Sequence, residues 1–162
     1  MGGSSASDLA VFERIVELLR ARGCPFELLE HPAAATAREA AAARGTELAL
    51  GTKAILFKYG KELGVFAMSA DRAVHSARIR RALGVQRTRF ATAAELRELT
   101  GLAPGEVPPF GEPVLPFPLY ADPSVLERPT MLFTAGSRTR SIRMAPRDYE
   151  AAAKPRVFRF VR

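Results

Sequence analysis

The chain of 162 residues predicts a single α/β domain built on a mixed β-sheet. Apolar stripes at helical spacing, several opened by a capping residue and closed by a glycine, alternate with short apolar runs typical of strands. They do not follow the regular βαβ order of a doubly wound fold. Because 48% of the residues are hydrophobic, the chain can bury one core, but it is too short for two ordinary domains. We expect one domain over residues 8–162, after a small, polar and disordered start over residues 1–7.

The first three elements are predicted from periodicity and end signals. Apolar residues recur at helical spacing over residues 7–22, and Gly23 ends this helix. The segment FELLEHP suits a short strand. The capping-box spacing of TARE, with Thr36 as N-cap, predicts a helix through the following alanines that Gly45 ends.

A hairpin and a second pair of helices follow. Residues 52–59 and 63–69 predict two strands joined by a short Gly-Lys turn. Residues 76–83 predict a helix, and TAAE repeats the capping-box spacing at the start of another helix over 92–99. A short strand over 87–90 separates the two helices.

The last third of the chain changes character. GLAPGEVPPFGEPVLPFPLYADP crowds prolines and glycines into a stretch that cannot be helical, so we expect a loop there that leads into an edge strand. TMLFTAG and TRSIRMA predict two strands around Gly136. PRDYEAAA predicts a helix with Pro146 in its first turn, and RVFRFV a last strand.

The charge of the chain indicates an acidic partner. The formal net charge is +7, with 24 Lys and Arg against 17 Asp and Glu, and arginine pairs bidentately with phosphate and stacks on bases. Nucleic acid is the leading candidate. No run of 18 apolar residues and no signal-peptide pattern occurs, and a single cysteine excludes an intrachain disulfide. We expect a cytoplasmic protein without a membrane partner.

Several kinds of chemistry lack their usual residues. The one cysteine, Cys24, and the two histidines, His31 and His75, are scattered and leave no zinc-type spacing. No Gly-x-Ser-x-Gly elbow, P-loop or GxGxxG motif occurs. We expect no metal and no cofactor, and ordinary hydrogen-bonded roles for both histidines.

Three features remain as candidates for function. Lys53 shares a strand face with Ile55 and Phe57, and is either a solvated lysine or a cation in a pocket that holds an anion or polarises a carbonyl. The loop GEVPPFG, residues 105–111, is either a rigid connection or a place where backbone N–H groups approach a ligand. TAGSRTRSI, residues 134–142, is either a hairpin turn or a second set of backbone donors.

Taken together and in this order, these features resemble the YbaK/prolyl-tRNA synthetase-associated domain family. The motifs are GTKAIL around Lys53, GEVPPFG, the turn DPSVL and the strand pair FTAGSRTRSI, and EHP followed by Thr36 and an alanine-rich helix also fits. The resemblance covers residues 31–149, nearly the whole chain. It implies a mixed, strongly curved β-sheet with helices packed around it.

The resemblance also implies trans-editing, the hydrolysis of the ester between a wrong amino acid and tRNA. The chain would be a free-standing aminoacyl-tRNA deacylase that acts on the aminoacylated acceptor end, often of tRNA for proline, with an aminoacyl-tRNA synthetase as an optional partner. Ala54, Ser137 and Ser141 depart from the side chains of some alanine- and cysteine-specific members. These departures leave the amino acid specificity open, and we expect a small or hydroxylated amino acid such as alanine, serine, threonine or cysteine.

Residue by residue, the resemblance implies the following site. Lys53, Gly105 and Gly111 are catalytic. The substrate-binding residues are Thr36, Ala54, Pro108, Pro109, Phe110, Thr134, Ala135, Gly136 and Ser137. Arg78, Arg81 and Arg138 are the expected contacts to the tRNA.

An aminoacyl ester is already labile, so such a site needs orientation and oxyanion stabilisation more than a strong nucleophile. Lys53 would hold the terminal adenosine phosphate or the substrate carbonyl, and N–H groups of residues 105–111 would receive the oxyanion. Water would attack, with the neighbouring ribose hydroxyl moving the proton. Two alternatives stay open: a non-catalytic tRNA-binding or synthetase-associated module, and a binder of small molecules or nucleotides in the same pocket.

Overall fold

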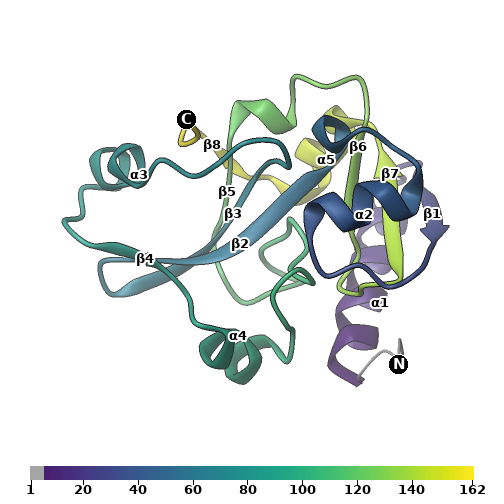
Figure 1. Cartoon of the computed structure of the whole chain (residues 1–162), viewed down its shortest axis with the longest axis horizontal. Coiled ribbons are helices and arrows are strands. Elements are labelled where there is room, and N and C mark those ends of the chain that lie inside the picture. The colour runs from purple at the N-terminus through teal and green to yellow at the C-terminus, as the bar shows by residue number, and fades with distance from the viewer. Residues whose placement is uncertain (1–5) are drawn as a thin grey trace.

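The computed structural model describes residues 6–162, which form five α-helices, two 3-10 helices and eight strands (Figure 1). In chain order these are α1 (Ala6–Ala21), β1 (Glu27–Glu30), α2 (Ala37–Arg44), η1 (Leu48–Leu50), β2 (Thr52–Tyr59), β3 (Glu62–Ser69), α3 (Ser76–Leu83), β4 (Thr88–Phe90), α4 (Ala93–Thr100), β5 (Leu119–Ala121), η2 (Pro123–Val125), β6 (Met131–Thr134), β7 (Arg140–Met144), α5 (Pro146–Ala153) and β8 (Arg156–Val157). The predicted helices and the hairpin lie within one or two residues of these bounds. The last strand is shorter than predicted.

The structure does not test two expectations, the disordered start of the chain and its cytoplasmic location. Residues 1–5, most of the start that we expect to be disordered, lie outside the described residues. No helix among residues 6–162 is long and apolar enough to cross a membrane. The cytoplasmic location stays a prediction.

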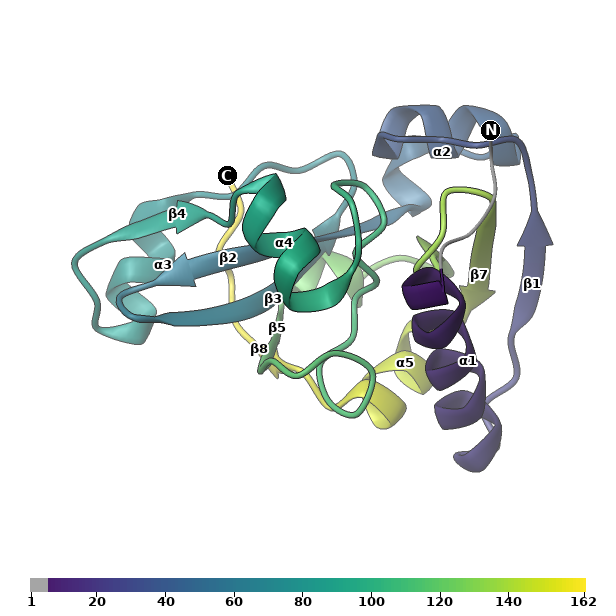
Figure 2. The same ribbon diagram turned by 90° about the horizontal axis from the view of Figure 1, so that it is seen from below.

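The strands form a mixed sheet in two parts. The larger part has the order β4-β2-β3-β5-β8, antiparallel from β4 to β3 and parallel from β3 to β8. The smaller part, β1-β7-β6, is antiparallel throughout. A single bridge between Gly51 and Leu132 joins the start of β2 to β6, and the strands of the two parts run in different directions (Figure 2). The predicted α/β class and mixed sheet are confirmed.

The position of β5 corrects one expectation. We expected an edge strand after the proline-rich loop, but β5 lies between β3 and β8 and its three residues are buried. The register places Leu119 beside Val65 in a parallel pair. Parallel partners are distant in the chain, so no local pattern indicates such a pairing.

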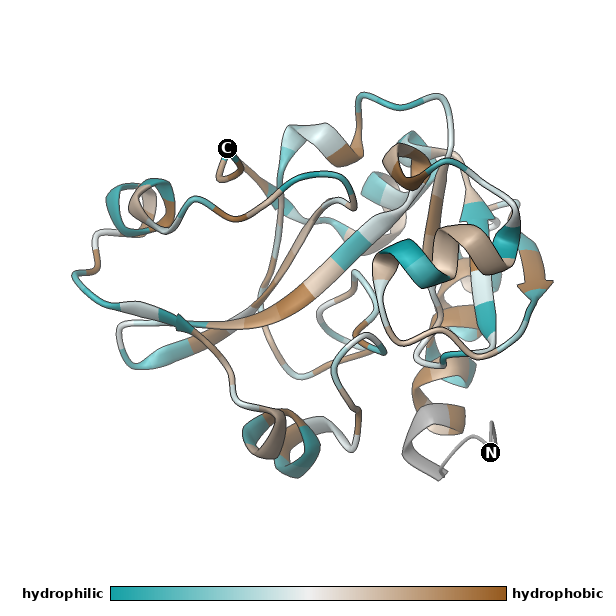
Figure 3. Ribbon diagram, viewed as in Figure 1, coloured by the Kyte–Doolittle hydropathy of each residue, from teal (hydrophilic) through white to brown (hydrophobic). Residues whose placement is uncertain are grey.

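The two faces of β2 pack into different cores. Ala54 and Leu56 contact a large core under α1 and α5, whereas Ile55 and Phe57 contact a smaller, mostly aromatic core. This alternation confirms the predicted faces of the strand. In Figure 3 the ribbon of β2 is brown along its middle and turns teal near its start beside α2, so the strand changes from apolar to polar where the smaller sheet begins.

Helix α2 lies beside that polar start and has well-defined ends. Thr36 is its N-cap, with the hydroxyl oxygen accepting from the Glu39 N–H at 3.1 Å. The Glu39 carboxylate accepts from the Ala35 N–H at 2.9 Å, one residue before the position that a capping box predicts. Gly45 ends the helix in the left-handed conformation, with φ 68°. These caps fix the helix next to the segment that carries Lys53.

Candidate functional site

A narrow pocket of about 50 Å³ opens where α2, the start of β2 and the loop after α4 meet. Five of the residues that the sequence suggests for the site line it: Thr36, Lys53, Ala54, Gly105 and Thr134. They come from four separate segments of the chain, and the fold brings them together. Lys53 and the start of the 105–111 loop therefore share one cavity.

Lys53 occupies the second position of β2, opposite Met68 of β3. Within residues 6–162 its ammonium makes no hydrogen bond or ion pair. Partial burial lowers the pKa of Lys53, and the charge of Asp71 opposes this shift. A cation that is partly removed from water and has no close partner is free to interact with a substrate.

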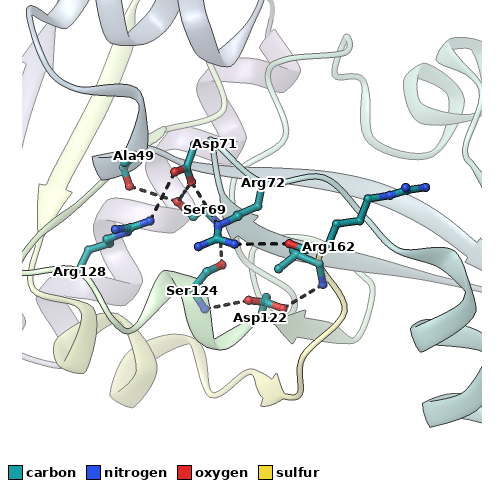
Figure 4. A network of polar contacts seen from close by, with 9 residues as sticks. Ala49, Ser69, Asp71, Arg72, Asp122, Ser124, Arg128 and Arg162 are labelled. Atoms are coloured by element: carbon teal, nitrogen blue, oxygen red, sulfur yellow. Dashed lines mark hydrogen bonds and ion pairs between the residues drawn. The ribbon is translucent and has the colours of Figure 1, made fainter.

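Asp71 does not pair with Lys53, because a polar network holds it (Figure 4). The Ser69 hydroxyl donates to Asp71 Oδ1 at 2.6 Å, and Arg128 Nη2 lies 3.5 Å from Oδ2. The Ser69 hydrogen bond foremost, with help from the Arg128 charge, holds the pKa of Asp71 below its usual range. The carboxylate therefore acts on Lys53 at a distance while the ammonium stays unpaired.

The first half of the 105–111 loop faces the pocket. Gly105 adopts φ 89°, and a Cβ there would collide with the carbonyl oxygen of Ala35, so a side chain does not fit. The Glu106 N–H donates to Ala103. The N–H groups of Gly105 and Val107, both in the pocket wall, donate to no acceptor in the described chain. They are the loop donors that a ligand in the pocket could use.

The second half of the loop turns into the core. Phe110 is fully buried, with its ring centroid 5.4 Å from that of Phe133 and 5.5 Å from that of Tyr149. The Tyr149 hydroxyl donates to the Pro109 carbonyl at 2.6 Å. Gly111 packs against the backbone of Phe117 and Leu119 and lines a different groove. The predicted residues Pro108, Pro109, Phe110 and Gly111 therefore do not line the pocket and instead anchor the loop.

Residues 134–137, from the end of β6 into the turn that follows, also contribute only at their start. Thr134 lines the pocket, and its hydroxyl donates to the Gly105 carbonyl at 3.5 Å. Ala135, Gly136 and Ser137 are buried outside the pocket, and a Cβ at Gly136 would collide with Val11 of α1. Arg138 Nη2 donates to the Pro104 carbonyl at 3.3 Å and so ties this turn to the loop.

Arg44 is a pocket residue that the sequence reasoning missed. It lies in the last turn of α2, where a basic residue ordinarily complements the helix dipole, so its type and position gave no distinct signal. Its Nη1 donates to the Ser141 hydroxyl at 3.3 Å, and its Nε is buried without a partner. Burial, and then the charge of Arg143, lower the pKa of Arg44. None of the described residues in the pocket wall is acidic.

Ser141 and His31 hold the Arg44 guanidinium in place. Ser141 is fully buried, and its hydroxyl lies 2.7 Å from His31 Nε2. His31 Nδ1 lies 2.9 Å from the Pro32 carbonyl, which can only accept. In the neutral imidazole, Nδ1 is therefore the donor and Nε2 accepts from Ser141. The Ser141 oxygen is left to accept from Arg44.

The predicted tRNA contacts on α3 lie away from the pocket. Arg78 and Arg81 are exposed and line a shallow groove with His75 and Arg159. Figure 1 shows α3 near the turn of the β2–β3 hairpin, whereas α2 is near its open end. Among residues 6–162, no group of three or more His, Cys, Asp or Glu side chains is arranged to hold a metal ion.

Comparisons with known proteins agree with this arrangement. Residues 31–152 match the model of the aminoacyl-tRNA editing domain. The chain is 33% identical over 156 residues to an Escherichia coli (strain K12) protein named multifunctional Ser/Thr-tRNA deacylase ProXp-y, covering 93% of this chain and 92% of that protein.

Solved structures share the fold over the same length. A structure described as a candidate trans-editing enzyme for prolyl tRNA synthetase has a TM-score of 0.80 and 31% identity, covering 99% of both chains. Another, described as a hypothetical protein, has a TM-score of 0.80 and 27% identity, covering 92% of this chain and 99% of that one. The resemblance carried by GTKAIL, GEVPPFG and FTAGSRTRSI is thus confirmed. The chain belongs to the aminoacyl-tRNA editing domain family, which includes the YbaK-like proteins, and is a deacylase that hydrolyses mischarged aminoacyl-tRNA.

Proposed function

We propose that this deacylase preferentially removes serine and threonine from tRNA, and that the reaction depends on Lys53. The observation that carries the proposal is the unpaired, half-buried ammonium of Lys53 in one narrow pocket with Gly105 and Val107. The E. coli relative is named a Ser/Thr-tRNA deacylase, which supports the two hydroxylated amino acids.

The size and lining of the pocket support this specificity. A volume of about 50 Å³ suits a small side chain, and three threonines, Thr36, Thr52 and Thr134, line the wall. A hydroxyl in the substrate pairs with such groups, whereas an isosteric methyl leaves them unpaired. Alanine and cysteine would fit by size but make fewer polar contacts, so we expect them to be released more slowly.

The chemistry follows from the few groups present. Water attacks the carbonyl carbon of the ester, and the N–H groups of Gly105 and Val107 receive the negative charge that develops on the carbonyl oxygen. Lys53 adds a positive charge beside that oxygen. The bond to the ribose oxygen then breaks, and that oxygen leaves with a proton. Because no described residue of the pocket wall is a carboxylate or histidine, the neighbouring ribose hydroxyl is the proposed route for the proton.

The rest of the tRNA would contact the basic surface near α3. Arg78 and Arg81 are exposed and have Arg159 beside them, which suits binding of backbone phosphates. Arg138, which holds Pro104, would act by positioning the loop. The structure described as a candidate trans-editing enzyme for prolyl tRNA synthetase supports tRNA for proline as the carrier and a synthetase as a further partner.

The test is the release of amino acid from one tRNA for proline charged in turn with serine, threonine, valine, alanine, cysteine and proline. We expect serine and threonine to be released fastest and proline to be retained. Threonine and valine are nearly isosteric, so this pair isolates the contribution of the hydroxyl group.

Two outcomes would overturn the proposal. Release of valine as fast as threonine would show that the pocket does not recognise the hydroxyl. Full activity of Lys53→Ala on seryl-tRNA would show that the reaction does not depend on Lys53. Serine attached to a second tRNA species, measured in parallel, separates recognition of the amino acid from recognition of the tRNA.

A further inference from the structure

The cations of the pocket have no carboxylate to pair with. Arg44 and Lys53 both line it, and none of the other described lining residues is acidic. Within residues 6–162, Arg44 makes no ion pair, and its single hydrogen bond to a side chain is to the neutral Ser141. Its Nε is buried without a partner. A partly buried guanidinium that keeps its charge without a counter-ion is costly unless an anion completes it.

The two cations lie on the same side of β2. Arg44 Nη2 lies 3.2 Å from the position that a Cβ of Gly51 would occupy. Gly51 and Lys53 are alternate residues of one extended segment, so their side-chain positions face the same way, about 7 Å apart along the strand. An anion bound beside Arg44 would therefore lie on the same side of the strand as Lys53.

The chemistry of the substrate identifies this anion. The amino acid end of an aminoacyl-tRNA carries an ammonium and a neutral ester, and the nearest negative charge is the phosphodiester that joins the last two nucleotides. We propose that Arg44 binds the terminal phosphodiester of the tRNA, which leaves Lys53 to act on the ester. This inference rests on the proposed function. The sequence left two roles open for Lys53, holding the terminal phosphate or the substrate carbonyl, and the inference gives the first role to Arg44 and the second to Lys53.

Ser141 and His31 act as positioning residues for this contact. Arg44 is a long side chain with many rotamers, and a fixed guanidinium loses less entropy when it binds phosphate. The hydrogen bonds from Arg44 to Ser141 and from Ser141 to His31 fix one of its terminal nitrogens. The other terminal nitrogen, Nη2, makes no hydrogen bond within residues 6–162 and is left for an oxygen of the phosphodiester.

The test compares two small substrates that differ only in charge. Both carry a seryl ester on the adenosine of a cytidine–adenosine dinucleotide. One has the natural phosphodiester and the other a neutral methylphosphonate. For the wild-type chain we expect kcat/KM to be about 10- to 100-fold higher with the charged linkage, the range of a charge-assisted hydrogen bond. In Arg44→Gln this preference should fall to about twofold or less, while kcat/KM for the neutral substrate stays near wild type.

Three variants complete the design. Arg143→Gln removes a neighbouring cation that does not line the pocket, and should keep the preference. Ser141→Ala should reduce the preference through KM more than through kcat, and carries the test if Arg44→Gln does not fold. Lys53→Ala should lower kcat/KM for both substrates by the same factor. An unchanged kcat/KM in Lys53→Ala would contradict the proposed function, whereas an unchanged charge preference in Arg44→Gln would contradict only the Arg44 assignment.

The assignment is overturned if the wild-type chain shows no preference for the charged linkage. It is equally overturned if Arg44→Gln keeps the wild-type preference, or if it lowers kcat/KM for both substrates by the same factor. In the case that Arg44→Gln is unfolded, a wild-type preference in Ser141→Ala overturns it. Circular dichroism of each variant establishes which of these cases applies.

Discussion

The two ends of the β2–β3 hairpin differ sharply although they belong to the same strands. At the turn end, Phe57, Tyr59 and Phe66 are buried in an aromatic core with Tyr120 and Phe160. Phe66 alone contacts four other rings, with centroid separations of 4.8–5.8 Å. At the open end, Gly51 to Ala54 form part of a pocket wall, and Lys53 there has no close partner within residues 6–162. We call these the aromatic end and the pocket end.

The difference shows how the fold accommodates an unfavourable site. Burial of apolar and aromatic surface at one end stabilises the hairpin, and the same strands hold unpaired polar groups at the other end. Functional sites commonly retain such locally unfavourable groups because the surrounding structure fixes them. Substitutions at the aromatic end should therefore change stability, and substitutions at the pocket end should change activity.

The largest effect is expected at the aromatic end. Phe66→Ala removes a fully buried ring and should lower the free energy of unfolding by about 3–5 kcal/mol, the usual cost of deleting a buried aromatic side chain. Chemical denaturation measures this change. The fraction that remains folded should keep the wild-type KM for seryl-tRNA. A large rise in KM would contradict the claim that substitutions at the aromatic end change stability and not activity.

A smaller effect should distinguish two helix caps. Thr36 caps α2 in the pocket wall, and Thr92 caps α4 elsewhere, each with its hydroxyl accepting from a glutamate N–H. Thr36→Ala and Thr92→Ala should each lower the free energy of unfolding by about 1 kcal/mol. Only Thr36→Ala should also slow deacylation, measured at a temperature where both variants are folded. Equal activity in the two variants would remove Thr36 from the site.

The smallest effect concerns the stability cost of Lys53 itself. Burial lowers the pKa of Lys53 in the folded chain below its pKa in the unfolded chain. Between these two pKa values the unfolded chain binds more protons than the folded chain. The free energy of unfolding therefore rises with pH across that interval. At pH 7, below the interval, the full cost of the charged amine is present. Lys53→Met should therefore be slightly more stable than the wild type at pH 7.

The pH dependence of this difference is diagnostic. The advantage of Lys53→Met should shrink as the pH approaches about 10.4, the ordinary value for lysine. Denaturation of both proteins at neutral and alkaline pH measures it, with Lys61→Met at the exposed turn as the control. A difference that does not change with pH would contradict the burial of the charge.

Local patterns in the sequence were sufficient for most of the fold. Capping threonines and closing glycines place α2 and α4, a closing glycine ends α3, and alternation places β2 and its two faces. The interior position of β5 was not predictable, because it depends on parallel pairing with strands far away in the chain. The shortness of β8 has a related cause: Asp122 holds the segment after it through the Phe160 and Val161 N–H groups instead of a continued strand ladder.

The site could be predicted only in part. The order of the motifs predicted Lys53, Gly105 and Thr134 as site residues, and all three line the pocket. Motifs do not show where a loop turns, so Phe110 and Gly136 seemed equivalent to Gly105 although they pack in the core and against α1. Arg44 was missed because an arginine at the end of an alanine-rich helix is common. Two tertiary facts about the described residues distinguish it: its Nε has no hydrogen-bond partner among them, and the pocket wall that they form contains no carboxylate.

The most direct test of the account is the single-turnover rate of deacylation of seryl-tRNA by Lys53→Ala, measured beside the wild type and Lys61→Ala. We predict a loss of about 10²–10³-fold for Lys53→Ala, comparable to the removal of one oxyanion-stabilising group, with unfolding stability at least equal to the wild type. Lys61→Ala should retain the wild-type rate. A Lys53→Ala rate within a few-fold of the wild type would contradict the assignment of the reaction to the pocket end of the hairpin.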